Sequence, residues 1–100
     1  MPKYKLSPRA SEQLRGMWRH IAERNEPAAD MLIQRLFEKF ELAAEHPEMG
    51  VARPEISVSA RILIEGNYVA IYEPAEYGAE IVVVVHGMRN PAHWLEQSCT

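Results

Sequence analysis

The stretch that decides the fold is ARILIEGNYVAIYEPAEYGAEIVVVVHGMRN, residues 60–90 of a chain of 100 residues. Apolar side chains follow a period close to two along residues 61–65 and again along 68–72, which predicts two neighbouring strands. Gly66-Asn67 between them is typical of a two-residue hairpin turn. Residues 80–86 are mostly apolar at consecutive positions, as expected of an interior strand that is covered on both faces or nearly so. The stretch therefore predicts a three-stranded antiparallel meander.

The first half of the chain has the periodicity of helices. Residues 3–6 alternate and predict a short strand, and Ser7-Pro8 is a favourable helix entry, with a cap followed by proline. Asn25-Glu26-Pro27 is expected to end the first helix, because the residue before a proline is pushed out of the α region. A second apolar face runs along residues 29–44 and ends at His46-Pro47. Two such helices with a short loop must pack as an antiparallel hairpin. The apolar residues of the first helix are Ala10, Leu14, Met17, Trp18 and Ile21.

The remaining segments complete the predicted architecture. Residues 47–58 are expected to form a loop and residues 73–79 a second turn, and a short C-terminal helix would hold Pro91, Trp94 and Leu95. The order of elements predicts an α+β fold in which an N-terminal strand and a helical hairpin pack on one face of an antiparallel β-sheet. The opposite face of the sheet is expected to be exposed. At this length we expect a single domain.

The composition excludes several classes of protein. The content of 47% hydrophobic and 25% charged residues is that of an ordinary globular protein. A single cysteine, Cys99, excludes an intrachain disulfide framework and a multi-cysteine zinc site. No cofactor or metal motif is present. The longest apolar run, residues 81–85, is far too short for a membrane helix, and residues 1–10 lack a signal peptide's apolar region, so a cytoplasmic location is expected.

Charge is divided unevenly between the two halves of the chain. Residues 1–50 carry eight basic and eight acidic side chains, whereas residues 51–100 carry three basic and six acidic ones, so the whole net charge of −3 lies in the second half. Proteins gain affinity for a polyanion with each phosphate that a Lys or Arg neutralises. The predicted sheet is therefore poorly equipped to bind RNA, sequence-specific DNA binding is not expected, and a protein target is favoured.

The side chains that could carry chemistry gather near the end of the last strand. His86 could transfer protons near neutral pH, and Arg89 could bind a phosphate. Arg61 begins the first strand of the meander, and Tyr68 and Tyr72 lie on the second. On the open face of an antiparallel sheet, these residues could together cleave an RNA backbone. The alternative is structural: such a histidine is more often hydrogen-bonded in place, the tyrosines pack on the sheet, and the arginine pairs with a carboxylate.

Five segments carry a resemblance to a known family. They are YKLSPRASEQL (4–14), AAEHPEMG (43–50), ARPEI (52–56), ARILIEGNYVAIYEP (60–74) and IVVVVHGMRN (81–90). In this order and spacing they resemble the ParE toxins of the RelE/ParE superfamily, the toxin half of bacterial type II toxin–antitoxin modules. The resemblance runs from about Lys3 to Glu96 and implies the order of strand, helical hairpin and sheet given above.

The activity that the resemblance implies depends on the subfamily. RelE-type members are mRNA endonucleases that act in the ribosome, whereas ParE-type members lack that catalytic set and inhibit DNA gyrase. Val83 and Glu73 stand where arginine is common in relatives, and no lysine follows Lys39. We therefore expect a gyrase inhibitor without enzymatic activity, whose target-facing surface includes Arg61, Tyr68, Tyr72, His86 and Arg89.

Two alternatives stay open. In a ribosome-dependent mRNA endonuclease, Arg61 and Arg89 would hold the phosphate and His86 would transfer a proton. In a degenerate module, the chain would bind its antitoxin without harming the cell.

The resemblance also implies a partner. Antitoxins of this family wrap an amphipathic segment around the helical hairpin and across the sheet, so a cognate ParD-like antitoxin and a hetero-oligomer are expected. Exposed apolar side chains on the hairpin would then form a binding site. The candidates for this contact are Leu32, Leu36 and Phe40.

Overall fold

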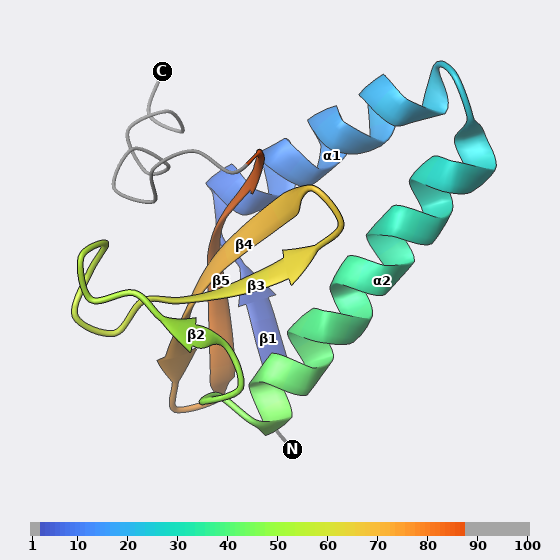
Figure 1. Ribbon diagram of the computed structural model, residues 1–100. Coiled ribbons are helices and arrows are strands. Elements are labelled where there is room, and N and C mark those ends of the chain that lie inside the picture. Colours follow the sequence, from blue (N-terminus) through green and yellow to red (C-terminus); the bar gives the residue numbers. More distant parts are fainter. Residues whose placement is uncertain (1–2, 88–100) are drawn as a thin grey trace.

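The computed structural model describes residues 3–87, which form two helices and five strands (Figure 1). The predicted α+β class is confirmed, whereas the predicted C-terminal helix lies outside the described residues. No helix within residues 3–87 is long and apolar enough to cross a membrane. The elements are β1 (Lys3–Leu6), α1 (Pro8–Ala22), α2 (Glu26–Glu45), β2 (Val51–Ala52), β3 (Arg61–Glu65), β4 (Tyr68–Ala75) and β5 (Gly78–His86).

The strands form one sheet in the order β1-β5-β4-β3-β2. Strands β3, β4 and β5 are the predicted antiparallel meander. Strand β1 pairs with β5 in the parallel direction, with Lys3 opposite Gly78, so the sheet is mixed and the prediction of an antiparallel sheet is wrong at this edge. The physical reason is the connection after β1. Strands joined by a tight turn must be antiparallel, but β1 is followed by two helices, which let the chain return in either direction.

The strands are longer than the periodicity predicts. Strand β4 continues to Ala75 and β5 begins at Gly78, so the second turn is shorter than the expected 73–79. The pairing of β3 with β4 stops at Tyr72, which lies opposite Arg61, so the part of β4 that contains Pro74 has only β5 as a neighbour. A proline is tolerated there because its missing N–H faces no second strand. Strand β2 lies within the predicted loop 47–58 and pairs with the start of β3.

Local capping explains where the helices begin. The Ser7 hydroxyl accepts the N–H of Ala10 at 2.9 Å and donates to the Val82 carbonyl at 2.7 Å. The same side chain thus caps α1 and attaches its start to β5, beside the irregularity in the pairing of β4 with β5. Asn25 caps α2 by accepting the N–H of Ala28. The predicted start of the first helix at Ser7-Pro8 is confirmed, whereas α2 begins at Glu26, so Glu26 and Pro27 of the predicted breaker form its first turn.

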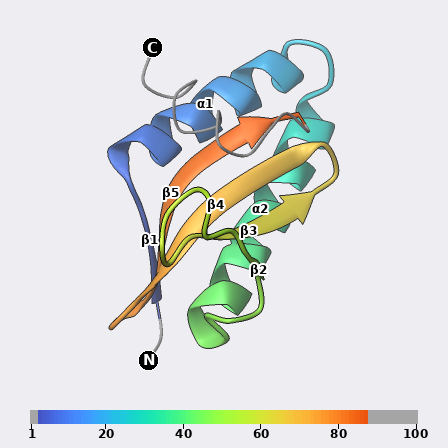
Figure 2. The same ribbon diagram turned by 60° about the vertical axis from the view of Figure 1, so that its left-hand side comes forward.

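Both helices lie on the same side of the sheet (Figures 1 and 2). Between the helices and the sheet lies the main core, in which side chains of α1 and α2 meet side chains of β3, β4 and β5. Its members include Leu14, Leu36, Phe40, Leu63, Tyr72, Ile81 and Val84.

The opposite face of the sheet is not the exposed surface that the sequence predicts. It carries a second apolar cluster, because β4 and β5 place apolar side chains on both faces, and Ile56 from the loop before β3 packs against it. The members of this cluster are each at most 3% exposed, and they are Ala60, Ile62, Val69, Ile71 and Val83.

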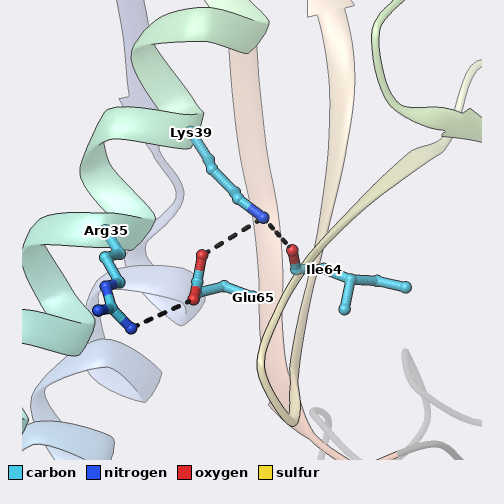
Figure 3. A network of polar contacts seen from close by, with 4 residues as sticks. All are labelled: Arg35, Lys39, Ile64 and Glu65. Atoms are coloured by element: carbon cyan, nitrogen blue, oxygen red, sulfur yellow. Dashed lines mark hydrogen bonds and ion pairs between the residues drawn. The ribbon is translucent and has the colours of Figure 1, made fainter.

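A charged network attaches α2 to the end of β3 (Figure 3). The Glu65 carboxylate lies 3.3 Å from Lys39 Nζ and 4.0 Å from Arg35 Nη1. Lys39 Nζ also donates to the Ile64 carbonyl oxygen. The Glu65 side chain is only 18% exposed, so solvent screens this network less than a free surface pair.

Candidate functional site

Arg61 and Tyr72 lie opposite each other on β3 and β4, and together they hold the turn that follows α2. The Tyr72 hydroxyl donates to the Pro47 carbonyl at 2.7 Å and accepts the N–H of Gly50 at 2.9 Å. Arg61 Nη1 donates to the carbonyl oxygens of Glu48 and Gly50, at 2.9 and 2.7 Å. These four bonds fix residues 46–50, which we call the α2 turn, against the end of the sheet.

The contact between the α2 turn and the sheet is too close for any side chain at position 50. A Cβ on Gly50 would lie 2.6 Å from Cε1 of Tyr72 and 2.8 Å from the Ile62 carbonyl oxygen. Tyr72 is fully buried, so the prediction that it faces a target is wrong. Arg61 binds the backbone carbonyls of Glu48 and Gly50, a structural role that differs from the carboxylate pairing considered as the alternative.

Burial raises the pKa of the Tyr72 hydroxyl above its ordinary value of 10.0, and the smaller effects of the Gly50 bond and Arg61 oppose this shift. We expect Tyr72→Phe to lower the free energy of unfolding at neutral pH by about 1–3 kcal/mol, because the Pro47 carbonyl and the Gly50 N–H lose their partner. Denaturant unfolding of both proteins, with Tyr68→Phe at a partly exposed tyrosine as control, measures this loss.

The sign of the pH dependence follows from the same shift. The folded chain holds the Tyr72 proton more tightly than the unfolded chain, so this contribution to stability is complete below pH 10.0 and is lost as pH rises through the raised pKa. The stability of the wild type should therefore fall more steeply above pH 10.0 than that of Tyr72→Phe. Equal slopes in the two proteins would contradict the assignment.

The other two described candidates lie at the opposite end of the same strands. Tyr68 faces His86 across β4 and β5, with ring centroids 4.9 Å apart in an edge-to-face arrangement. Strand alternation places Tyr68 on the helix side of the sheet, the same side as Tyr72, and not on the opposite face. Within residues 3–87 the predicted constellation is thus two separate pairs, and Arg89 lies outside the described residues.

Four cations near β2, β3 and the facing part of α2 have partners within the chain. Arg35 and Lys39 flank Glu65, Arg61 is bonded to carbonyls, and Arg53 lies 3.8 Å from Glu55. In the described chain after α2, both basic side chains are therefore engaged. With only two basic side chains, this part of the described chain offers a row of phosphates few cations.

An apolar groove runs between the two helices and reaches Leu6 of β1. Two adjoining hollows, of about 410 and 260 Å³, share Trp18, Ile33 and Phe37 in their walls. Trp18 Nε1 donates to the Asp30 carboxylate at 2.7 Å and so joins α1 to α2 beside the groove. We call it the hairpin groove. Its further apolar residues are Leu6 and Leu14, and its acidic residues are Asp30, Glu38 and Glu41.

The predicted antitoxin contacts are not the residues that line this groove. Leu36 is 1% and Phe40 0% exposed, because both point into the main core, and Leu32 packs partly buried against it. A partner of the folded chain therefore cannot touch Leu36 or Phe40, and that prediction is wrong for both. The residues that sequence reasoning missed lie further round the same helix, at Ile33 and Phe37.

Trp18 is the signal that could have revealed the groove. Its spacing places it with the core residues of α1, yet it is only partly buried. A large aromatic residue at the edge of an apolar stripe, with an acidic residue available on the next helix, indicates a groove wall as well as a core position. Among residues 3–87, no group of His, Cys, Asp and Glu could hold a metal ion.

The fold is shared with a toxin–antitoxin structure. The described arrangement matches a solved chain from the "Chromosomal ParDE TA system from P. aeruginosa" with a TM-score of 0.72 and 19% sequence identity. The alignment covers 88% of this chain and 98% of that one. At this identity the match establishes the fold alone. A search of curated proteins finds no match.

The sequence itself identifies the family. Residues 4–91 match the family described as "ParE toxin of type II toxin-antitoxin system, parDE". The chain belongs to this ParE toxin family.

Proposed function

We propose that this protein is a toxin that inhibits DNA gyrase and is neutralised by a cognate ParD-like antitoxin in the cytoplasm. Membership of the ParE toxin family supports the toxin role. The observation that favours a protein target is the scarcity of cations after α2: within the described residues there are only Arg53, which lies 3.8 Å from Glu55, and Arg61, which donates to two backbone carbonyls. A protein that acts on another protein does not need free cations to neutralise a row of phosphates.

The mRNA endonuclease is the less favoured alternative. Arg61 already uses Nη1 to hold two carbonyl oxygens of the α2 turn, and His86 would have to act at the other end of the sheet's strands. General acid–base catalysis needs its groups within hydrogen-bond reach of the same substrate atoms. The described pairs do not meet this condition.

The hairpin groove is the surface that we propose for the antitoxin. An amphipathic helix can lay its apolar side chains against Trp18, Ile33 and Phe37, and basic residues on its borders would face Glu38 and Glu41. This partner would cover apolar area that the free chain leaves open to water, so a tight hetero-oligomer is expected.

The decisive experiment uses the purified chain with gyrase and relaxed plasmid DNA. We expect loss of ATP-dependent supercoiling and trapped gyrase–DNA breaks, and we expect prior addition of the antitoxin to abolish both effects. Transcript integrity after induction in cells is the control for the endonuclease alternative. Rapid mRNA cleavage with undisturbed gyrase would replace the proposal by that alternative, and normal growth on induction would favour the degenerate module.

A further inference from the structure

The α2 turn and the loop before β3 together form another hollow, separate from the hairpin groove. This hollow, of about 620 Å³, shares no residue with the groove, and its walls include Pro47, Met49, Ala52 and Val58. We call it the elbow hollow. Val58 is 98% and Met49 43% exposed, so these side chains contribute little to the core.

The exposed Val58 lies on a loop that is held in place. The N–H of Arg53 donates to the Ala60 carbonyl at 2.9 Å and closes the loop at its base. The Ser57 hydroxyl donates to the Glu73 carboxylate at 2.9 Å, and Ile56 packs against the second apolar cluster. The loop thus presents an apolar side chain to solvent in a fixed position, which reduces the conformational entropy that a binding partner must remove.

The opposite wall of the elbow hollow is fixed as well. Tyr72 and Arg61 hold the α2 turn through its backbone, so the Met49 side chain projects from a rigid segment. Two of the residues that the sequence singled out as functional, Arg61 and Tyr72, are therefore positioning residues for this surface.

The charges around the elbow hollow are mainly acidic. Glu45 and Glu48 line it with exposed side chains, and the cation in its wall, Arg61, donates to the carbonyls of the α2 turn. A complementary surface therefore combines an apolar side chain with Lys or Arg.

We infer that the elbow hollow is the surface through which this toxin contacts its protein target, which inserts an apolar side chain next to Val58 and places Lys or Arg beside Glu45 and Glu48. The inference rests on the proposed function, since it assumes a protein target, and it adds the contact surface and the chemistry of the partner. The antitoxin occupies a different surface, the hairpin groove.

The test compares Val58→Glu with Met31→Glu. Both substitutions add the same charge at an exposed apolar residue, and Met31, which is 52% exposed on α2, lies outside both hollows. The measurements are growth arrest on induction, affinity for purified gyrase and affinity for the antitoxin. We expect Val58→Glu to lower gyrase affinity at least about tenfold and to abolish growth arrest, with antitoxin affinity unchanged and Met31→Glu like the wild type. Glu45→Gln with Glu48→Gln should weaken the salt dependence of gyrase binding.

Each outcome has a definite meaning. Wild-type toxicity and gyrase affinity in Val58→Glu would overturn the inference, and so would a loss of antitoxin binding alone, because the occupant would then be the antitoxin. If the wild type arrests growth without binding gyrase, the proposed target is wrong, whereas loss of arrest in Val58→Glu still supports the surface. A wild type that causes no arrest overturns both.

Discussion

Replacing Phe40 by alanine should lower the free energy of unfolding by about 3–5 kcal/mol. The Phe40 ring is fully buried where α2 packs on the β1 edge of the sheet. Its ring centroid lies 5.5 Å from that of Tyr4 and 6.1 Å from that of Phe37. Removing it leaves a cavity that surrounding side chains can fill only in part. Urea unfolding followed by circular dichroism gives the change directly.

Leu42→Ala is the matched control for this experiment. Leu42 lies on the same helix but is 47% exposed, so its truncation should change stability by less than about 1 kcal/mol. A small effect at Phe40, accompanied by weaker antitoxin binding, would show that Phe40 contacts the partner and would contradict its place in the core.

Replacing Trp18 by alanine should lower the affinity for the ParD-like antitoxin by about 2–4 kcal/mol, a factor of roughly 30 to 1,000. Trp18 contributes to both hollows of the hairpin groove and donates a hydrogen bond to Asp30. Its loss would remove a rigid wall of the proposed docking site. Binding measured by calorimetry, and rescue of growth by co-expressed antitoxin, should both decline.

Met31→Ala is the control for Trp18→Ala, because it truncates an exposed apolar side chain outside the groove and should leave antitoxin affinity nearly unchanged. Toxicity without antitoxin should persist in Trp18→Ala, since the variant keeps its core. Equal affinities of the two variants for the antitoxin would place the antitoxin elsewhere on the toxin.

Local patterns predicted the elements of this fold well. Ser7 caps α1 where the sequence places its start, Asn25 lies between the two helices as predicted, and Gly66-Asn67 forms the turn between β3 and β4. These features depend on residues close together in the chain. The parallel pairing of β1 with β5 depends on segments more than seventy residues apart, and no local pattern specifies it.

The candidate site was harder to predict for a related reason. Tyr72 shares a strand face with Tyr68, and the sequence does not show that this face packs against the helices. The Tyr72 hydroxyl bonds to the backbone of the α2 turn, a segment more than twenty residues earlier in the chain. Arg61 likewise finds its partners there. Sequence reasoning identified residues that matter but assigned them to a binding surface, because the contacts that occupy them are long-range.

The most direct test of this account is the supercoiling of relaxed plasmid by purified gyrase in the presence of the purified toxin. We expect the toxin to stop supercoiling and to increase gyrase-linked DNA breaks, and we expect the antitoxin to reverse both effects. Normal supercoiling with no added breaks, under conditions in which the same toxin preparation arrests growth or cleaves mRNA on ribosomes, would contradict it.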